Sequence, residues 1–140
     1  MEPLVQLTGD PLDVRALEDA VRHPGNGALL TFSGVARDDG DPPLEALFYE
    51  AWEEVALREL REVAAGTVAR WPGVRLAVAH RTGLVKVGEP SVVVAVGAGH
   101  RDEAYAASRF AIDTLKATVH IWKKEIYAEG GAWIANPESP

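Results

Sequence analysis

Apolar residues recur along this chain with two spacings, one typical of helices and one typical of strands. Three stretches repeat every three or four residues, as a buried helical stripe does. Their members are Leu12, Ala16, Leu17, Ala20 and Val21; Ala56, Leu57, Leu60, Val63, Ala64 and Thr67; and Ala104, Ala107, Ala111, Thr114 and Leu115. The pattern predicts a first helix capped by Asp10, with Pro11 in its first turn, that stops at residues 23–25. It predicts a second helix from Trp52 to Val68 and a third that is capped by Asp102 and ends near Lys116 or Ala117.

Short runs rich in β-branched and aromatic residues predict the strands between these helices. They cover residues 4–7, 27–32, 44–49, 74–80, 91–96 and 118–126. In the 74–80 run apolar and other residues alternate, which predicts one face on the core. Residues 82–90 are predicted to form a connection between two strands, and Gly130-Gly131 a turn before residues 132–134. The order is β-α-β-β-α-β-β-α-β. Because the third strand follows the second without a helix between them, we predict an α+β sandwich with a mixed, largely antiparallel sheet.

Length and composition narrow the range of possible functions. A chain of 140 residues predicts one domain, spanning residues 1–140. The net charge of −7 argues against nucleic acid or anionic membranes as partners. The absence of cysteine excludes disulfides and any mechanism that carries sulfur on a thiol of this chain. No leader pattern and no run of eighteen apolar residues is seen, so we expect a cytoplasmic protein.

Cations gather in one stretch of this acidic chain, from Gly99 to Glu125. It holds His100, Arg101, Lys116, Lys123 and Lys124. Like charges a few ångströms apart repel unless an anion lies between them, so the stretch predicts a site for a small anion. Arg37, at a strand end beside a loop rich in Asp, Gly and Pro, has a position common for ligand binding.

The strand period of two places Lys123 on the side of Val119 and Ile121, and Lys124 on the side of Trp122. One lysine should therefore be partly buried, and burial lowers a lysine pKa toward the range of acid–base catalysis.

Structural alternatives stand beside each of these interpretations. A Lys-Lys pair on a strand is often a solvated edge, and His100-Arg101 could be a helix-capping turn. Arg37 could pair with Asp38 or Asp39, and a histidine such as His80, at the end of an inward series, is more often a satisfied core residue than a ligand.

Several short motifs together resemble one family. They are TFSGVAR at Thr31–Arg37, RWP at Arg70–Pro72, HRTG at His80–Gly83, GHR at Gly99–Arg101, and DTLK followed by WKKE between Asp113 and Glu125. In this order and spacing they resemble the catalytic (large) subunit of molybdopterin synthase, over most of the chain from about Gly27 to Trp133.

The resemblance implies an α/β hammerhead-type fold and a homodimer of large subunits, each binding one small subunit, which makes a heterotetramer. The small subunit would be ubiquitin-like, with a thiocarboxylate on its C-terminal Gly-Gly. The substrate would be cyclic pyranopterin monophosphate, which receives two sulfurs to give the dithiolene of molybdopterin in molybdenum cofactor biosynthesis. No cofactor or metal of its own is implied, because the pterin is a substrate.

Residue by residue, Lys116 and Lys123 match the family's catalytic lysines. The resemblance suggests that Lys116 lies where the partner's C-terminal carbonyl docks and that Lys123 serves proton transfer and charge stabilisation. Substrate-binding positions would be Arg37, His100 and Arg101, with Lys124, Glu125 and Phe32 lining the site. Core packing would explain Phe32 equally well.

The chain departs from the family at two positions. Val35 stands where many members carry lysine, so Val35 and the adjoining Ala36 would contribute backbone contacts. Asn136 stands where the family often has arginine, and Arg109 or the partner chain could supply that contact. The alternative function is a non-catalytic module that binds a ubiquitin-like tail or a small phosphorylated ligand.

Overall fold

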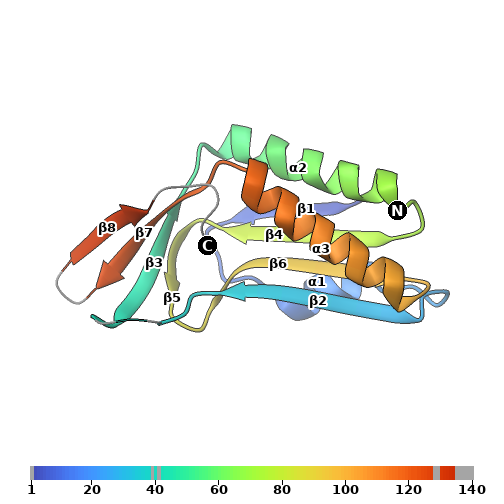
Figure 1. Ribbon diagram of the computed structural model, residues 1–140, viewed down its shortest axis with the longest axis horizontal. Coiled ribbons are helices and arrows are strands. Elements are labelled where there is room, and N and C mark those ends of the chain that lie inside the picture. The colour runs from blue at the N-terminus through green and yellow to red at the C-terminus, as the bar shows by residue number, and fades with distance from the viewer. Residues whose placement is uncertain (1, 39, 41, 128–129, 135–140) are drawn as a thin grey trace.

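The computed structural model describes residues 2–38, 40 and 42–127, and the backbone of residues 130–134. Within these ranges the chain forms three helices and two four-stranded sheets (Figure 1). The prediction of a mixed, largely antiparallel α+β fold is confirmed. The elements in chain order are β1 (Leu4–Thr8), α1 (Val14–Val21), β2 (Ala28–Val35), β3 (Leu44–Glu50), α2 (Glu53–Arg70), β4 (Arg75–Arg81), β5 (Gly83–Lys86), β6 (Pro90–Ala98), α3 (Arg101–Thr118), β7 (Trp122–Tyr127) and β8 (Gly130–Ile134).

Sheet A has the strand order β1-β4-β6-β2, with β1 parallel to β4 and the other pairs antiparallel. Helices α2 and α3 lie on one face and α1 on the other (Figure 1). The central strands are therefore buried on both faces, and the prediction that β4 has only one face on the core is wrong. Ala77 and Ala79 pack with Leu17 and Val21 of α1, while Leu76 and Val78 belong to the larger core under α2 and α3.

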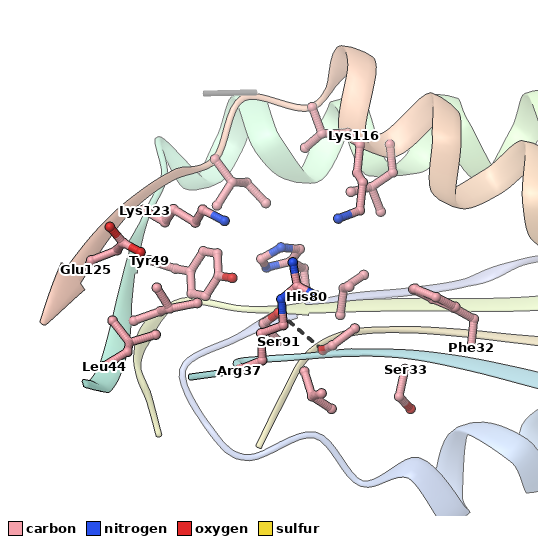
Figure 2. Close-up of a pocket in the computed structure, with 17 residues that line it drawn as sticks. Phe32, Ser33, Arg37, Leu44, Tyr49, His80, Ser91, Lys116, Lys123 and Glu125 are labelled. Atoms are coloured by element: carbon pink, nitrogen blue, oxygen red, sulfur yellow. Dashed lines mark hydrogen bonds between the residues drawn. The ribbon is translucent and has the colours of Figure 1, made fainter. Parts of the chain in front are cut away.

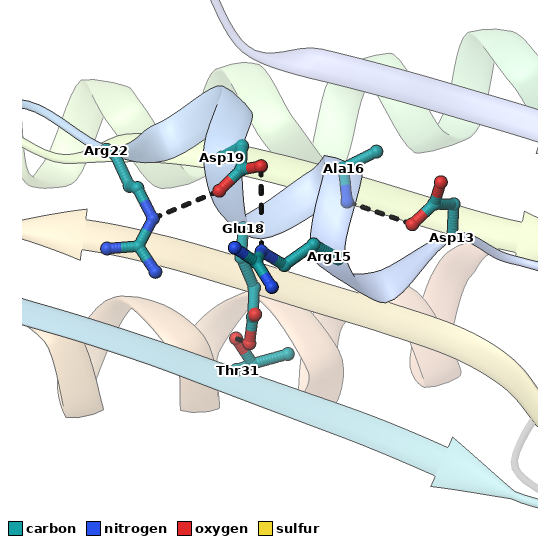
Figure 3. A network of polar contacts seen from close by, with 7 residues as sticks. All are labelled: Asp13, Arg15, Ala16, Glu18, Asp19, Arg22 and Thr31. Atoms are coloured by element: carbon teal, nitrogen blue, oxygen red, sulfur yellow. Dashed lines mark hydrogen bonds and ion pairs between the residues drawn. The ribbon is translucent and has the colours of Figure 1, made fainter.

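Helix α1 begins three residues later than its sequence predicts. Its N-cap is Asp13, whose Oδ1 accepts a hydrogen bond from the Ala16 N–H at 3.0 Å. The predicted cap, Asp10, is wrong, because its N–H instead donates to the Thr8 hydroxyl and closes the turn after β1. The Thr31 hydroxyl donates to Glu18 at 2.7 Å and joins α1 to β2, beside ion pairs that Asp19 forms with two arginines (Figure 3).

Sheet B has the order β5-β3-β7-β8 and is antiparallel throughout. Strand β5 was predicted as a connection, and Gly130 and Gly131 as a turn. Both predictions are wrong: β5 pairs with β3, and the two glycines lie in β8 opposite Tyr127 and Ile126. Because β7 lies between β3 and β8, its Lys-Lys pair is not on a sheet edge.

Helix α3 is longer at both ends than predicted. His100 is its N-cap, and Asp102, the predicted cap, lies within the first turn. There its negative carboxylate interacts favourably with the positive N-terminal end of the helix dipole. At the other end the Thr118 hydroxyl donates to the Thr114 carbonyl at 2.7 Å. Thr118 is thus helical and Val119 is the C-cap, so the following strand starts only at Trp122.

The contact between α1 and β6 depends on Gly97. A methyl group there would overlap the Val21 carbonyl, which closes α1. We predict that Gly97→Ala lowers the free energy of unfolding by about 2–3 kcal/mol, as overpacking against backbone does. Urea denaturation measures this. The control is Gly66→Ala in α2, where a Cβ meets open space, and it should stabilise by up to ~1 kcal/mol. A Gly97→Ala protein as stable as the wild type would contradict this packing.

Candidate functional site

A cavity of about 390 Å³ lies where one end of sheet A meets sheet B and the C-terminal end of α3. Its walls come from residues 32–35 of β2 and from Arg37 after it, from β3, β4, β6 and β7, and from α3 (Figure 2). The site therefore depends on strands and a helix that the two cores hold in place. Leu44, Leu47, Val92, Leu115 and Ile121 supply apolar wall.

Three of the predicted cationic residues converge here. Arg37, Lys116 and Lys123 line the cavity, reaching it from the segment after β2, from the end of α3 and from β7 (Figure 2). Lys123 is only 7% exposed, whereas Lys124, on the other side of β7, is half-buried and does not line the cavity. The alternation that separated the two lysines is confirmed.

Burial changes the protonation of Lys116. The loss of solvation lowers the pKa of its amine, and nearby Asp113 opposes this in part. A lysine with a lowered pKa can give up and take back a proton more readily near neutral pH. Lys116 therefore combines charge with a capacity for proton transfer.

His80 also lines the cavity, at the end of β4. It is 6% exposed, and its Nδ1 lies 2.7 Å from the Arg81 carbonyl oxygen. Burial lowers the pKa of His80 to about 4, the bond to the Arg81 carbonyl opposes this, and the charge of Lys116 lowers it further. The imidazole is neutral at physiological pH.

Two further polar groups complete the walls. Burial raises the pKa of the Tyr49 hydroxyl, and its hydrogen bond with Ser91 opposes the shift. Glu125 alone among the described lining residues carries a carboxylate, and its Oε1 accepts a hydrogen bond from the Tyr127 hydroxyl at 2.9 Å. With three cations facing one carboxylate, the cavity suits an anionic ligand.

The remaining predicted residues differ in where the structure places them. Phe32, Val35 and Glu125 line the cavity, and Phe32 is 38% exposed, so core packing does not explain it. Ala36 is buried without lining the cavity. Arg109, suggested as a replacement for the missing family arginine, is paired with Asp113 at 2.9 Å and is not in the wall. Asn136 lies outside the described residues.

His100 and Arg101 are not brought to this cavity. They lie at the N-terminal end of α3, and Lys116 lies near its C-terminal end. At 1.5 Å per residue this separation is about 22 Å. Within one chain, the predicted cluster of five cations is therefore divided between the two ends of a helix.

Sequence reasoning did not select His80, Tyr49 or Ser91 for the site. His80 was interpreted as a satisfied core histidine, and its burial and hydrogen bond agree with that. The sequence did offer one indication for His80: it is the last inward-facing residue of the predicted strand, and residues at strand ends often line functional sites. Tyr49 and Ser91 carry no comparable signal in the sequence.

The described residues contain no cluster of three or more His, Asp or Glu side chains suited to a metal ion. No helix in the described part of the chain is long and apolar enough to cross a membrane.

Fold and cavity together define a small α+β protein with a lysine-lined cavity for an anion. Comparison with known proteins then gives the family. The family model described as MoaE protein matches residues 7–118. The chain is 40% identical to a molybdopterin synthase catalytic subunit of Nostoc sp., covering 96% of this chain and 84% of the relative. It is 39% identical to the human protein of the same name, over 96% of this chain and 72% of the relative. The chain belongs to the MoaE family, and the resemblance found in its motifs is confirmed.

Solved structures agree. A crystal structure of molybdopterin synthase from Staphylococcus aureus superposes with a TM-score of 0.88 at 30% identity, covering 93% of this chain and 96% of that one. A second match, at 21% identity and a TM-score of 0.76, covers 100% of this chain and 94% of that one. It is described as a protein–protein complex of subunits 1 and 2 of the molybdopterin-converting factor from Helicobacter pylori. At that identity the second match supports the fold alone.

The buried neutral histidine makes stability depend on pH. The pKa of His80 is about 4 in the folded chain and returns to an ordinary value of 6.5 on unfolding. Between these values the unfolded chain binds more protons, so stability is complete above about pH 6.5 and falls as the pH drops toward 4, by about 3 kcal/mol in total. Urea denaturation at several pH values measures it. His80→Gln, which cannot titrate, should lose less stability over this range, and parallel curves for both proteins would contradict the assignment.

Proposed function

We propose that this chain is the catalytic subunit of a molybdopterin synthase. It transfers two sulfurs from the C-terminal thiocarboxylate of a ubiquitin-like small subunit to cyclic pyranopterin monophosphate, which becomes the dithiolene of molybdopterin. The observation that carries this proposal is the convergence of Lys116, Lys123 and Arg37 on one cavity, with Lys123 almost fully buried. The names and high coverage of the curated relatives support it.

The chemistry fits the side chains. The chain has no cysteine, so the sulfur must arrive on a partner. Both reactants, a thiocarboxylate and a cyclic phosphate, are anions. Lysines held in a partly desolvated cavity stabilise such charges more strongly than they would in water. Arg37, exposed at the cavity, can form forked hydrogen bonds to a phosphate.

The two lysines have different surroundings, which supports different roles. Lys116 lies in the last turn of α3 and has a lowered pKa, so it suits the docking point of the partner's C-terminal carbonyl, where a proton must be moved. Lys123 is more deeply buried, on a central strand of sheet B. It suits charge stabilisation and proton transfer while sulfur attacks the pterin. The curated relatives are named catalytic subunits of a synthase, which supports a second, partner subunit.

We further propose that the working protein is a homodimer in which His100 and Arg101 act on the cavity of the second copy. They lie about 22 Å from Lys116 in their own chain. Strand β2 is one of the two edge strands of sheet A and exposes Leu29, Phe32 and Val35. A two-fold contact along β2 reverses the second copy, so the start of its α3 lies on the side of the first cavity.

Lys116→Ala and Lys123→Ala should each slow dithiolene formation by about a hundredfold or more while the chain stays folded, because each removes a charge or proton-transfer group from the reacting centre. A single-turnover assay with pterin monophosphate and thiocarboxylated small subunit measures this. Lys86→Ala, on the exposed face of β5, is the matched control and should keep the wild-type rate. If wild type binds both reactants but makes no dithiolene, the chain is a binding module and the proposal fails.

Mixing two inactive variants tests the shared site. Lys116→Ala and Arg101→Ala should each be impaired alone. After they are mixed and allowed to exchange chains, about a quarter of wild-type activity should return, because half of the dimers are mixed and each mixed dimer keeps one intact site. Activity that stays at the average of the two variants would place Arg101 outside the partner's cavity.

A further inference from the structure

His80 has a fixed position inside the cavity. It comes from the end of β4 and is 6% exposed. Its ring packs against the Tyr49 ring in a T-shaped arrangement, with centroids 5.1 Å apart and planes at 76°. Figure 2 shows the imidazole among the cationic side chains, with the amine of Lys116 directed toward it. Two neighbours thus hold the ring in one orientation, Tyr49 through the T-shaped ring contact and the Arg81 carbonyl through Nδ1.

The hydrogen bond at Nδ1 determines the tautomer. A carbonyl oxygen can only accept, so the proton between Nδ1 and the Arg81 carbonyl, 2.7 Å apart, belongs to Nδ1. In a neutral ring the other nitrogen, Nε2, then carries a lone pair. The ring is neutral because burial and the charge of Lys116 both lower the pKa of His80. The cavity therefore contains a fixed hydrogen-bond acceptor among its cations.

The charged and titratable groups around this acceptor come from four directions. Tyr49 lies on β3, Arg37 follows β2, Lys116 is in the last turn of α3, and Lys123 and Glu125 lie on β7. Of these, only the Lys116 charge acts on the protonation of His80. Two other polar groups of the wall have hydrogen-bond partners: Glu125 accepts from the Tyr127 hydroxyl, and the Ser91 hydroxyl donates to the Gly34 carbonyl.

We propose that His80 positions Lys116: the Lys116 amine, which is directed toward the ring without a hydrogen bond to it in this structure, turns to donate to Nε2, and this bond holds the long side chain at the point where the reactants meet. A free lysine side chain has many rotamers, and an acceptor on a rigid ring selects one of them. The consequence for catalysis rests on the proposed function, whereas the contact itself does not. His80 is a positioning residue, because it acts through Lys116.

Two amide substitutions separate the roles of the two ring nitrogens. His80→Asn places an amide N–H near Nδ1, so it keeps the bond to the Arg81 carbonyl and removes the acceptor. His80→Gln places its amide oxygen near Nε2 and keeps the acceptor. We expect His80→Asn to slow sulfur transfer about tenfold or more, as losing a hydrogen bond to a charged group does, with kcat affected more than KM. His80→Gln should restore most of the rate, and His23→Asn, at an exposed histidine, should leave it unchanged.

The pKa of Lys116 provides a readout that a purely structural role would not move. An acceptor stabilises the ammonium, so its loss in His80→Asn should lower the pKa of Lys116 below its wild-type value, and His80→Gln should return it. The pH dependence of acylation of Lys116 by an amine reagent, followed by peptide mass spectrometry, measures this. An unchanged titration of Lys116 in folded His80→Asn would overturn the proposal.

A measurement on the wild-type protein tests the tautomer of His80 without any substitution. The ¹⁵N NMR spectrum of His80 should show a protonated Nδ1 and an unprotonated Nε2 at neutral pH. A proton on Nε2 would overturn the proposal even if neither variant folds. If the wild type transfers no sulfur, the proposed function fails, and the titration of Lys116 still decides whether His80 holds it.

Discussion

The structure depends on two central strands, β4 and β6, that are buried on both faces. Helix α1 closes one face through Ala77, Ala79, Val93 and Ala95, while α2 and α3 close the other. Only small residues allow this close approach, and Gly97 is the tightest point. Because the strands cannot move, their ends are fixed as well. His80 is the next-to-last residue of β4 and Ser91 is the second residue of β6, so the inner wall of the cavity is set by the packing of the core.

On that wall the chain gathers three cationic side chains around one cavity. Lys123 is almost fully buried, Lys116 is partly buried, and Arg37 lies nearby. Burial of cations that repel one another is unfavourable, and an anion between them offsets both costs. An acidic chain of net charge −7 thus contains a cavity that selects small anions. The neutral imidazole of His80 adds no further positive charge and supplies an acceptor.

Local sequence patterns predicted what depends on local physics. Helical stripes, strand alternation and the inward side of Lys123 all follow from side-chain period, and the structure has them. What failed depends on tertiary contacts. Nothing in the run from Arg75 to Arg81 shows that a second layer covers its other face, and nothing local shows that residues 83–86 find a partner in β3. His100 and Arg101 are near Lys116 in the sequence, but they lie at the start of α3 and Lys116 lies in its last turn. The helix rises 1.5 Å per residue, so these side chains are far apart in space.

The most direct test of this account is an intact-mass measurement of the thiocarboxylated small subunit, incubated with the wild-type chain with and without pterin monophosphate. The account predicts that the C-terminal sulfur is replaced by oxygen only when the pterin is present, with two small subunits converted for each pterin that becomes a dithiolene. A small subunit that keeps its sulfur, although both reactants bind the chain, would contradict the central claim that this cavity performs sulfur transfer.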